Sequence, residues 1–377
     1  MGSAKGLQKK QVPIAIVLVI AVIVVIACVL AFGGKGDEKS TAKNTKDSSA
    51  IKESTTGSLN GTTSKEEPTT QIAPPPISTP ADYTTSSSIV ISGTSAMEMY
   101  GISSKSLQRY SEIINAFSFT VPNTQVYVLL APTAIEFYGP EKYNTGNRSQ
   151  DEGIKIAYKA LDPKIKSVDA RLALRMHTDE YIYFRTDHHW TARGAYYAYT
   201  AFAKVAGFTP STLDTYIMGK IDGFVGSMYR YTQAQVLMDN PDYVETFTPA
   251  TPATGVIFSD ATMTQSRPLT IVANTVTAPN KYLAFIQGDN PIIKITTNNK
   301  NGKKIILIKE SYGNAIAPFL IDNYEEVYVT DPRKIDMNLA SFVNANGIDS
   351  VLFLNYTFAP SNATYMTAFS KMLGQVQ

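Results

Sequence analysis

An unbroken apolar run from Val12 to Phe32 sets the first limit on how this chain folds. About 20 such residues in a helix span the hydrocarbon core of a bilayer. Three lysines and no acid precede the run, whereas the lysines just after it are balanced by acids. The positive-inside rule therefore predicts a cytoplasmic tail (1–11), a single transmembrane helix (12–32) and a cell-membrane protein whose C-terminal domain is extracellular.

Two other interpretations of this segment remain open. A cleaved signal peptide has a shorter apolar core and a small-residue cleavage site, which is not evident here. Val25-Ile26-Ala27-Cys28 resembles a lipoprotein cleavage box with Cys28 as the lipidated residue, although the apolar run continues to Phe32. Both interpretations still place the rest of the chain outside the cytoplasm. Because Cys28 is the only cysteine, no intrachain disulfide is possible, and the domain must be stable from its core alone.

Residues 33–88 are dominated by Ser, Thr, Lys, Gly and Pro, with too few apolar side chains to offset the entropy of ordering. We expect a disordered linker, with an r.m.s. span of about 40 Å if it behaves as a flexible coil. The formal net charge of the chain is +2, of which the tail contributes three positive charges and residues 33–88 contribute one negative charge. The domain 89–377 is therefore neutral, which gives no electrostatic reason to bind nucleic acid.

Short apolar strands alternate with amphipathic helices through most of residues 89–377. This alternation predicts an α/β fold, a mostly parallel sheet with helices on both faces. Residues 208–300 depart from the pattern, being rich in Thr, Pro, Gly and Tyr, and are expected to be a β-rich insertion. The expected strands are 89–91, 126–130, 181–185, 304–308, 326–329 and 350–354, and the expected helices are 103–117, 151–161, 191–206, 313–321 and 335–345.

Two short motifs hold the residues that chemistry needs. Thr186-Asp187-His188-His189-Trp190 follows the expected strand 181–185 and contains two of the three histidines and the only tryptophan. Glu310-Ser311-Tyr312-Gly313-Asn314 follows the expected strand 304–308, at a helix start. Chemistry in parallel sheets collects at the carboxyl ends of strands, so we expect the two motifs to form one site.

A serine hydroxyl becomes nucleophilic at neutral pH when an imidazole removes its proton and a carboxylate orients that imidazole. Asp187 and His189 are two residues apart, so in an extended segment they project to the same side. At a helix start, Ser311 has backbone N–H groups nearby that would stabilise an oxyanion, and Asn314 would add a side-chain donor. The two motifs together predict a Ser311, His189 and Asp187 triad.

Each motif alone has a plainer interpretation. Asp187 and Ser311 are residue types that commonly cap helices. Asp187, His188 and His189 would suit a metal, but a site would need further ligands and His177 lies in a different pattern. We therefore expect no metal and no cofactor. If His188 rather than His189 faces the serine, the base moves by one residue and to the opposite face.

Together, the two motifs resemble the DHHW protein family of Gram-positive bacteria, which is similar to the alginate O-acetyltransferases and their SGNH-hydrolase-like fold. In those relatives an Asp-x-His-Trp motif precedes the serine, a permuted order relative to ordinary SGNH esterases, and the order here agrees. The resemblance implies that Ser311 accepts the acyl group, with His189 as base and Asp187 orienting it. The residues that it implies for substrate, oxyanion or supporting contacts are Tyr312, Asn314, Arg333, His188 and Trp190.

The expected function is that of an extracytoplasmic O-acyltransferase, with acetyl as the acyl group, that modifies a cell-envelope or secreted polysaccharide. Because acetyl-CoA is cytoplasmic, the resemblance suggests a membrane-bound O-acyltransferase as the partner that supplies acyl groups across the membrane. An SGNH-type carbohydrate esterase would use the same triad with water as the acceptor. A third interpretation is a non-catalytic polysaccharide-binding or scaffold protein, with tyrosines around Tyr229-Arg230-Tyr231 as a sugar-stacking surface.

Overall fold

The computed structural model describes residues 82–375. The predicted tail, the transmembrane helix 12–32 and most of the predicted linker lie outside the described residues. Within 82–375, no helix is both long and apolar enough to cross a bilayer. The end of the predicted linker is wrong, because Thr84–Ser86 forms strand β1. Its backbone groups are satisfied by antiparallel pairing with β2 (Ile89–Ser92), which offsets the cost of ordering these polar residues.

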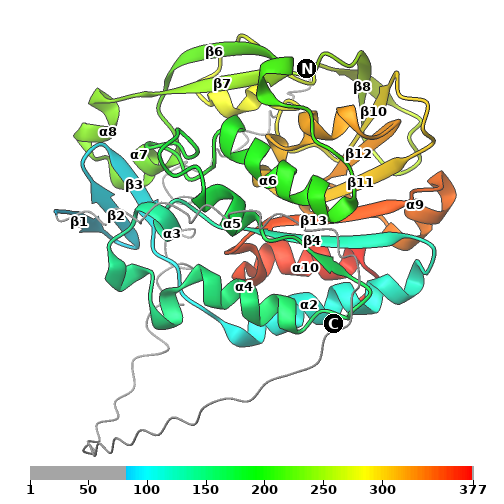
Figure 1. Ribbon diagram of the computed structural model, residues 1–377, viewed down its shortest axis with the longest axis horizontal. Helices are drawn as coiled ribbons and strands as arrows, with labels where there is room; N and C mark the ends of the chain where they lie inside the picture. Colours follow the sequence, from blue (N-terminus) through cyan, green and yellow to red (C-terminus); the bar gives the residue numbers. More distant parts are fainter. Residues whose placement is uncertain (1–81, 376–377) are drawn as a thin grey trace, which may run out of the picture. The chain divides into compact units, whose positions relative to one another are not determined.

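A mixed sheet of eight strands lies at the centre of the domain (Figure 1). Its members are β4 (Gln125–Ala131), β5 (Lys166–Ser167), β8 (Ala253–Phe258), β9 (Ser266–Leu269), β10 (Ile292–Thr297), β11 (Lys304–Lys309), β12 (Glu326–Thr330) and β13 (Ser350–Tyr356). The strand order is β5-β4-β13-β11-β12-β10-β8-β9. The strands from β5 to β12 are parallel, and β10, β8 and β9 continue the sheet with antiparallel pairing.

Each face of this sheet is buried in its own hydrophobic core. Alternate residues of a strand point to opposite faces, so Leu129 and Leu307 enter one core while Val128 and Ile306 enter the other. Figure 1 shows α6 on one side of the sheet and α2, α4 and α10 on the other. The first core includes side chains of α5 (Ala170–Arg175) and α6 (Ala192–Ala206), and the second those of α2 (Ser104–Thr120), α4 (Gln150–Lys159), α9 (Leu339–Asn346) and α10 (Ala363–Met372). The prediction of an α/β fold with a mostly parallel sheet is confirmed.

Residues 208–300 are β-rich, as predicted, but only part of the segment is an insertion. β8, β9 and β10 belong to the main sheet, because Ile293 pairs with Val329 of β12 on one side and with Ile257 of β8 on the other. Only β6 and β7 form a separate two-stranded sheet, and two short helices connect them. The bounds of these elements are β6 (Ile217–Phe224), α7 (Ser227–Thr232), α8 (Gln235–Asp239) and β7 (Asp242–Thr248).

The predicted strand 89–91 exists, but it lies in a small antiparallel sheet of β1, β2 and β3 (Ser95–Glu98). Ala96 of this sheet packs in a small apolar cluster with Met228 and Leu237, which come from α7 and α8. The small sheet and these helices therefore lie side by side, at one end of the main sheet (Figure 1).

The predicted helix 313–321 is wrong as an α-helix. Two 3-10 helices, Ser311–Asn314 and Ala317–Asp322, take its place. Pro318 has no N–H to donate to a carbonyl four residues earlier, so a continuous α-helix is interrupted there. The other short helices are α3 (Ile135–Tyr138) and the 3-10 segments Glu141–Tyr143, Gly146–Arg148, Leu213–Thr215, Lys281–Ala284, Pro332–Lys334 and Ala359–Ser361.

Candidate active site

The segment 186–190 lies in a loop rather than at the end of a sheet strand. The predicted strand 181–185 is wrong, because Tyr183 makes only an isolated antiparallel bridge with Trp190. The loop therefore closes on itself immediately before α6. The backbone N–H groups at its start are bonded by a side chain and not by the carbonyl groups of a neighbouring strand.

That supporting side chain is Asp242, at the start of β7. Its carboxylate accepts the backbone N–H of Arg185 at 3.0 Å and the backbone N–H of Thr186 at 2.7 Å. The Arg185 guanidinium also donates to it, at 3.0 Å. A buried carboxylate thus takes the place that carbonyl groups of an adjacent strand would otherwise fill.

Ser311 follows β11, as predicted, and begins the 3-10 helix 311–314. Glu310 caps this helix, because its side-chain carboxyl accepts the backbone N–H of Tyr312 at 3.0 Å. β11 lies between β12 and β13, so the serine emerges from the carboxyl end of a central parallel strand. This is the position at which parallel α/β sheets present reactive groups.

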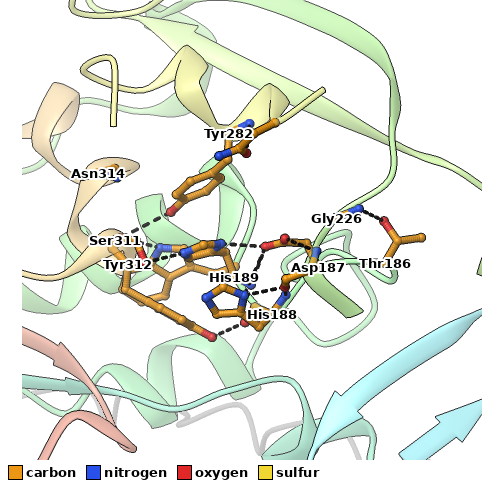
Figure 2. Close-up of polar contacts among 12 residues, drawn as sticks. Thr186, Asp187, His188, His189, Gly226, Tyr282, Ser311, Tyr312 and Asn314 are labelled. Atoms are coloured by element: carbon orange, nitrogen blue, oxygen red, sulfur yellow. Dashed lines mark hydrogen bonds and ion pairs between the residues drawn. The ribbon is translucent and has the colours of Figure 1, made fainter. Parts of the chain in front are cut away.

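The two motifs meet in one chain of hydrogen bonds (Figure 2). Nε2 of His189 lies 2.7 Å from Oγ of Ser311, and Nδ1 of His189 lies 2.6 Å from Oδ1 of Asp187. The backbone N–H of His189 also donates to that oxygen, at 3.1 Å. It is therefore His189, and not His188, that faces the serine.

Asp187 is held on its far side by α7. Its Oδ2 accepts the backbone N–H of Ser227 at 2.8 Å. Burial by itself raises the pKa of the Asp187 carboxyl, but His189, His188 and the hydrogen bonds outweigh burial and bring that pKa below its ordinary value. The carboxylate is thus ionised at neutral pH and able to orient the imidazole, the role of the acid in such triads.

The imidazole of His189 is also held by an aromatic ring. Tyr282 stacks on it with ring centroids 4.0 Å apart and an interplanar angle of 12°. The Tyr282 hydroxyl donates to the carbonyl oxygen of Tyr312 at 3.4 Å, which anchors the stacking ring (Figure 2). Because Tyr282 belongs to the segment 208–300, this segment fixes the plane of the His189 ring.

The model of the DHHW protein family matches residues 43–330 of this chain. The chain belongs to the DHHW family. A DHHW family protein from Eubacterium siraeum has 34% sequence identity to it and a TM-score of 0.71, covering 78% of this chain and 98% of that one. No functionally curated sequence matches.

Two further solved structures are similar in fold to this DHHW-family chain. Bacillus cereus PatB1 has 19% identity and a TM-score of 0.61, covering 75% of this chain and 98% of its own. Bacillus cereus PatB1 with a sulfonyl adduct has 18% identity and a TM-score of 0.60, covering 74% of this chain and 96% of its own.

In the DHHW-family site, Trp190 and Tyr312 support the triad from below. Both side chains are fully buried. The Trp190 indole donates to the Tyr312 carbonyl, and the Tyr312 hydroxyl donates to the His188 carbonyl. The Tyr312 backbone N–H is used by Glu310. Trp190 therefore packs beneath the site, as the family resemblance implies. The expectation that Tyr312 donates to an oxyanion is wrong, because its hydroxyl and its backbone N–H are both bonded within the protein.

Asn314 lies near the serine as predicted, and its side-chain orientation depends on an unpredicted residue. Its Nδ2 donates to Oδ1 of Asp289 at 3.1 Å, which leaves the second N–H of the amide for another acceptor. Its Oδ1 is buried and has no partner among residues 82–375. Asp289 thus decides which way the amide faces.

Asp289 is the centre of a charged cluster beside the site. Its carboxylate accepts from the fully buried ammonium of Lys309 at 2.7 Å and from the guanidinium of Arg333 at 3.0 Å. Burial raises the pKa of Asp289, but Lys309 and Arg333 outweigh it and set the pKa to about 2. Arg333 also pairs with Asp331, and within the described residues no hydrogen bond joins Arg333 to the triad.

Asp187, His188 and His189 also form the one group among the described residues whose possible metal-ligand atoms all lie within 4.8 Å of one another. All three side chains are already engaged in hydrogen bonds, and Nε2 of His188 is the one ring nitrogen of the group without a partner among the described residues. His188 Nδ1 pairs with the Ser227 hydroxyl, and His189 is bonded at both ring nitrogens. A metal would have to displace these contacts, so the donor set fits a proton relay better than a metal site.

Sequence reasoning missed several residues of the site, all of which come from the segment 208–300. They carry no motif of their own, since a glycine, a serine, a tyrosine and an aspartate are ordinary in a Thr- and Tyr-rich segment. The missed residues are Gly226, Ser227, Tyr282 and Asp289.

Proposed function

We propose that this chain is an extracytoplasmic O-acyltransferase, with acetyl as the acyl group, that esterifies a cell-envelope or secreted polysaccharide. The observation that carries the proposal is the hydrogen-bonded order Ser311, His189, Asp187, with distances of 2.7 and 2.6 Å. These distances lie within the range that proton transfer between a nucleophile and its base requires.

In the first half of the proposed reaction, Oγ of Ser311 attacks the carbonyl carbon of an acyl ester or thioester, and its proton passes to Nε2 of His189. The bond to the leaving group breaks, and the leaving group takes that proton. In the second half, a sugar hydroxyl gives its proton to His189 and attacks the acyl-serine. The serine oxygen then leaves and recovers the proton, so no other reactant is needed.

Charge that develops on the acyl oxygen needs hydrogen-bond donors. We assign this role to the backbone N–H of Ser311 and to the Asn314 amide, which retains a second N–H beyond its bond to Asp289. Asp289 would act as a positioning residue, because it fixes the direction of the amide.

The polysaccharide substrate and the SGNH-like character of the fold are parts of the proposal. They rest on the resemblance of the two motifs to the alginate O-acetyltransferases and on a fold similar to that of Bacillus cereus PatB1. We also propose that residues 12–32 anchor the domain outside the cell and that a membrane-bound O-acyltransferase supplies its acyl groups. An esterase of the same fold would use the same residues, with water in place of the sugar.

The test is acylation of the full chain by p-nitrophenyl acetate, followed by intact-mass and peptide analysis. We expect a single acetyl group on Ser311 and none in Ser311→Ala, whereas Ser341→Ala, which changes an exposed serine of α9, retains the adduct. Since one PatB1 structure carries a sulfonyl adduct, a sulfonyl fluoride provides a second label.

Ser311→Ala in the producing cell should also abolish the polysaccharide O-acetyl groups that the wild-type chain adds. A wild-type chain that both reagents leave unlabelled, or a Ser311→Ala cell with normal acetylation, would contradict the transferase. Rapid release of acetate to water with no transfer to polysaccharide would favour the esterase.

A further inference from the structure

His188 lies at the centre of the site and takes no part in the proton relay. Its ring centroid is 3.8 Å from that of His189, with an interplanar angle of 37° (Figure 2). Its Nδ1 lies 2.6 Å from Oγ of Ser227, and its carbonyl oxygen accepts the Tyr312 hydroxyl. The residue is therefore fixed at both its backbone and its ring.

The contacts of Ser227 decide which ring nitrogen of His188 carries the proton. Oγ of Ser227 accepts the backbone N–H of His188 at 3.2 Å, so its own hydrogen is free to be donated. Within the described residues, Nδ1 of His188 is the only acceptor bonded to this fully buried hydroxyl. Nδ1 thus accepts, and the proton of neutral His188 sits on Nε2.

His188 is the more open of the two imidazoles. Its side chain is 24% exposed, against 8% for His189. Within residues 82–375, no hydrogen bond uses its Nε2. Burial and the neighbouring His189 lower the pKa of His188, so the ring is neutral at pH 7. It therefore presents a fixed, uncharged N–H donor beside the base.

β3 and α7 both bond to the backbone of the two residues that precede Asp187. The backbone N–H of Ala96 in β3 donates to the carbonyl of Arg185 at 2.9 Å, and that of Met228 in α7 donates to the carbonyl of Thr186 at 3.0 Å. β3 ends at Glu98, and burial raises the pKa of its carboxyl above the ordinary value although His188 opposes the rise. α7 carries Tyr231, which remains 64% exposed.

α7 also lines a cavity of about 250 Å³ beside Asp187, with Tyr229 and Arg230 in its wall. The wall of this cavity includes Asp187 but not His188, Glu98 or Tyr231. Ligand sites combine aromatic side chains with a few polar groups that fix the orientation of the ligand.

We propose that His188, Glu98 and Tyr231 form the subsite that binds the sugar acceptor of the acyl group. Nε2–H of His188 donates to a sugar oxygen, the Glu98 carboxyl accepts a sugar hydroxyl, and the Tyr231 ring stacks on the apolar face of the pyranose. The subsite rests on the proposed transferase function, and it holds the attacking hydroxyl beside His189. His188 is thus a substrate-positioning residue and not a second base.

The experiment separates the two half-reactions of the full chain in detergent. p-Nitrophenyl acetate loads Ser311, and envelope polysaccharide from the producing cell, stripped of its esters by mild base, discharges it. The acylation rate is read from p-nitrophenolate release. The discharge rate is read from loss of the acetyl-Ser311 mass, with and without polysaccharide.

We expect His188→Phe and Tyr231→Ala each to lower polysaccharide-dependent discharge about tenfold more than acylation, as loss of one contact of about 1.4 kcal/mol implies. His188→Gln, which keeps an N–H near the Nε2 position, should recover most of the discharge. Phe119→Ala is the matched control, because Phe119 is also 64% exposed but lies on α2, and it should change neither rate.

Tyr231→Ala keeps the test decisive if His188→Phe fails to fold, since an exposed side chain adds little to stability. A wild-type chain that never acquires an acetyl group on Ser311 would refute the proposed function. A loaded wild-type chain that polysaccharide discharges no faster than water would refute the acceptor subsite, as would variants in which both rates fall equally.

Discussion

The indole N–H of Trp190 donates a hydrogen bond to the backbone carbonyl oxygen of Tyr312 at 2.9 Å. These residues directly follow the candidate base and the candidate nucleophile, and they are 122 positions apart in the chain. Both are fully buried. This bond and the bond from the Tyr312 hydroxyl to the His188 carbonyl link the loop 186–190 to the end of β11, beside the 2.7 Å contact between His189 and Ser311.

Trp190→Phe removes this donor and part of a fully buried ring. We expect the free energy of unfolding to fall by about 2–4 kcal/mol, because the smaller ring leaves a cavity and the Tyr312 carbonyl loses one of its two donors. Urea unfolding followed by circular dichroism measures it, because the variant lacks the only tryptophan. Tyr282→Phe removes the longer 3.4 Å donor to the same carbonyl and should cost less. Equal losses would contradict the role given to the indole.

Gly226→Ala should damage the triad without straining the backbone. A Cβ on Gly226 would lie 2.3 Å from Cβ and 2.4 Å from Oδ2 of Asp187, so the carboxylate must move. The φ of Gly226 is −97°, which alanine adopts freely. We expect the acylation rate to fall by about 10²-fold, as a displacement of about 1 Å implies.

Gly101→Ala is the control for this substitution, because a Cβ there has nothing within 4 Å. It should leave the p-nitrophenyl acetate rate at the wild-type value. An active Gly226→Ala would mean that the position of Asp187 is less important than the geometry suggests.

Asp289→Ala should be among the most destabilising changes at a polar residue of the domain. It leaves the ammonium of Lys309, whose side chain is 0% exposed, without the carboxylate 2.7 Å away. Breaking a buried pair from one side costs about 3–5 kcal/mol. It also frees the Asn314 amide, so acylation should slow together with the fall in melting temperature. Asp289→Asn with Lys309→Met removes both charges and should recover much of the stability.

The exposed pair of Lys371 and Asp336 is the control for the buried pair. It has a similar distance of 2.7 Å, but its side chains are 67% and 75% exposed. Asp336→Ala should therefore change stability by less than about 1 kcal/mol. A comparable loss in both alanine variants would show that burial does not govern the Asp289 cluster.

Glu310 should make the domain less stable as the pH rises. Burial raises the pKa of its carboxyl from 4.5 to about 7 in the folded chain. The hydrogen bonds from the backbone N–H groups of Tyr312 and Tyr356 lower this pKa, but by less than burial raises it. The unfolded chain therefore ionises first. The stabilising contribution is complete below pH 4.5 and is lost as the pH rises through 7, by about 3 kcal/mol in total.

Urea titrations of the full chain at pH 5 and pH 8, followed by Trp190 fluorescence, measure this loss. Glu310→Gln should be less stable at low pH and should lose about 3 kcal/mol less than wild type between pH 5 and pH 8. Glu136, whose pKa burial also raises to about 7, contributes equally to both proteins and cancels in the difference. The same pH dependence in wild type and variant would refute the assignment to Glu310.

The fold was predictable where one segment carried its own signal. β4, β11, β12 and β13 are buried on both faces, so each appears in the sequence as a continuous apolar run. The helix from Ala192 was equally clear, with Thr191 as its N-cap and Gly207 ending it in the left-handed region. Predictions failed where a distant group replaced a local one, as Asp242 does for the loop after residue 185.

By itself, the sequence determined that Asp187 and His189 belong to one short segment and that Ser311 follows a buried strand. Only the tertiary structure decided that these three meet, that His188 turns to Ser227 instead, and that Gly226, Tyr282 and Asp289 complete the site. The physical reason is the distance along the chain over which each kind of interaction acts. Periodicity and capping act over a few residues, whereas the contact between His189 and Ser311 spans 122 positions and exists only once both cores have packed around the sheet.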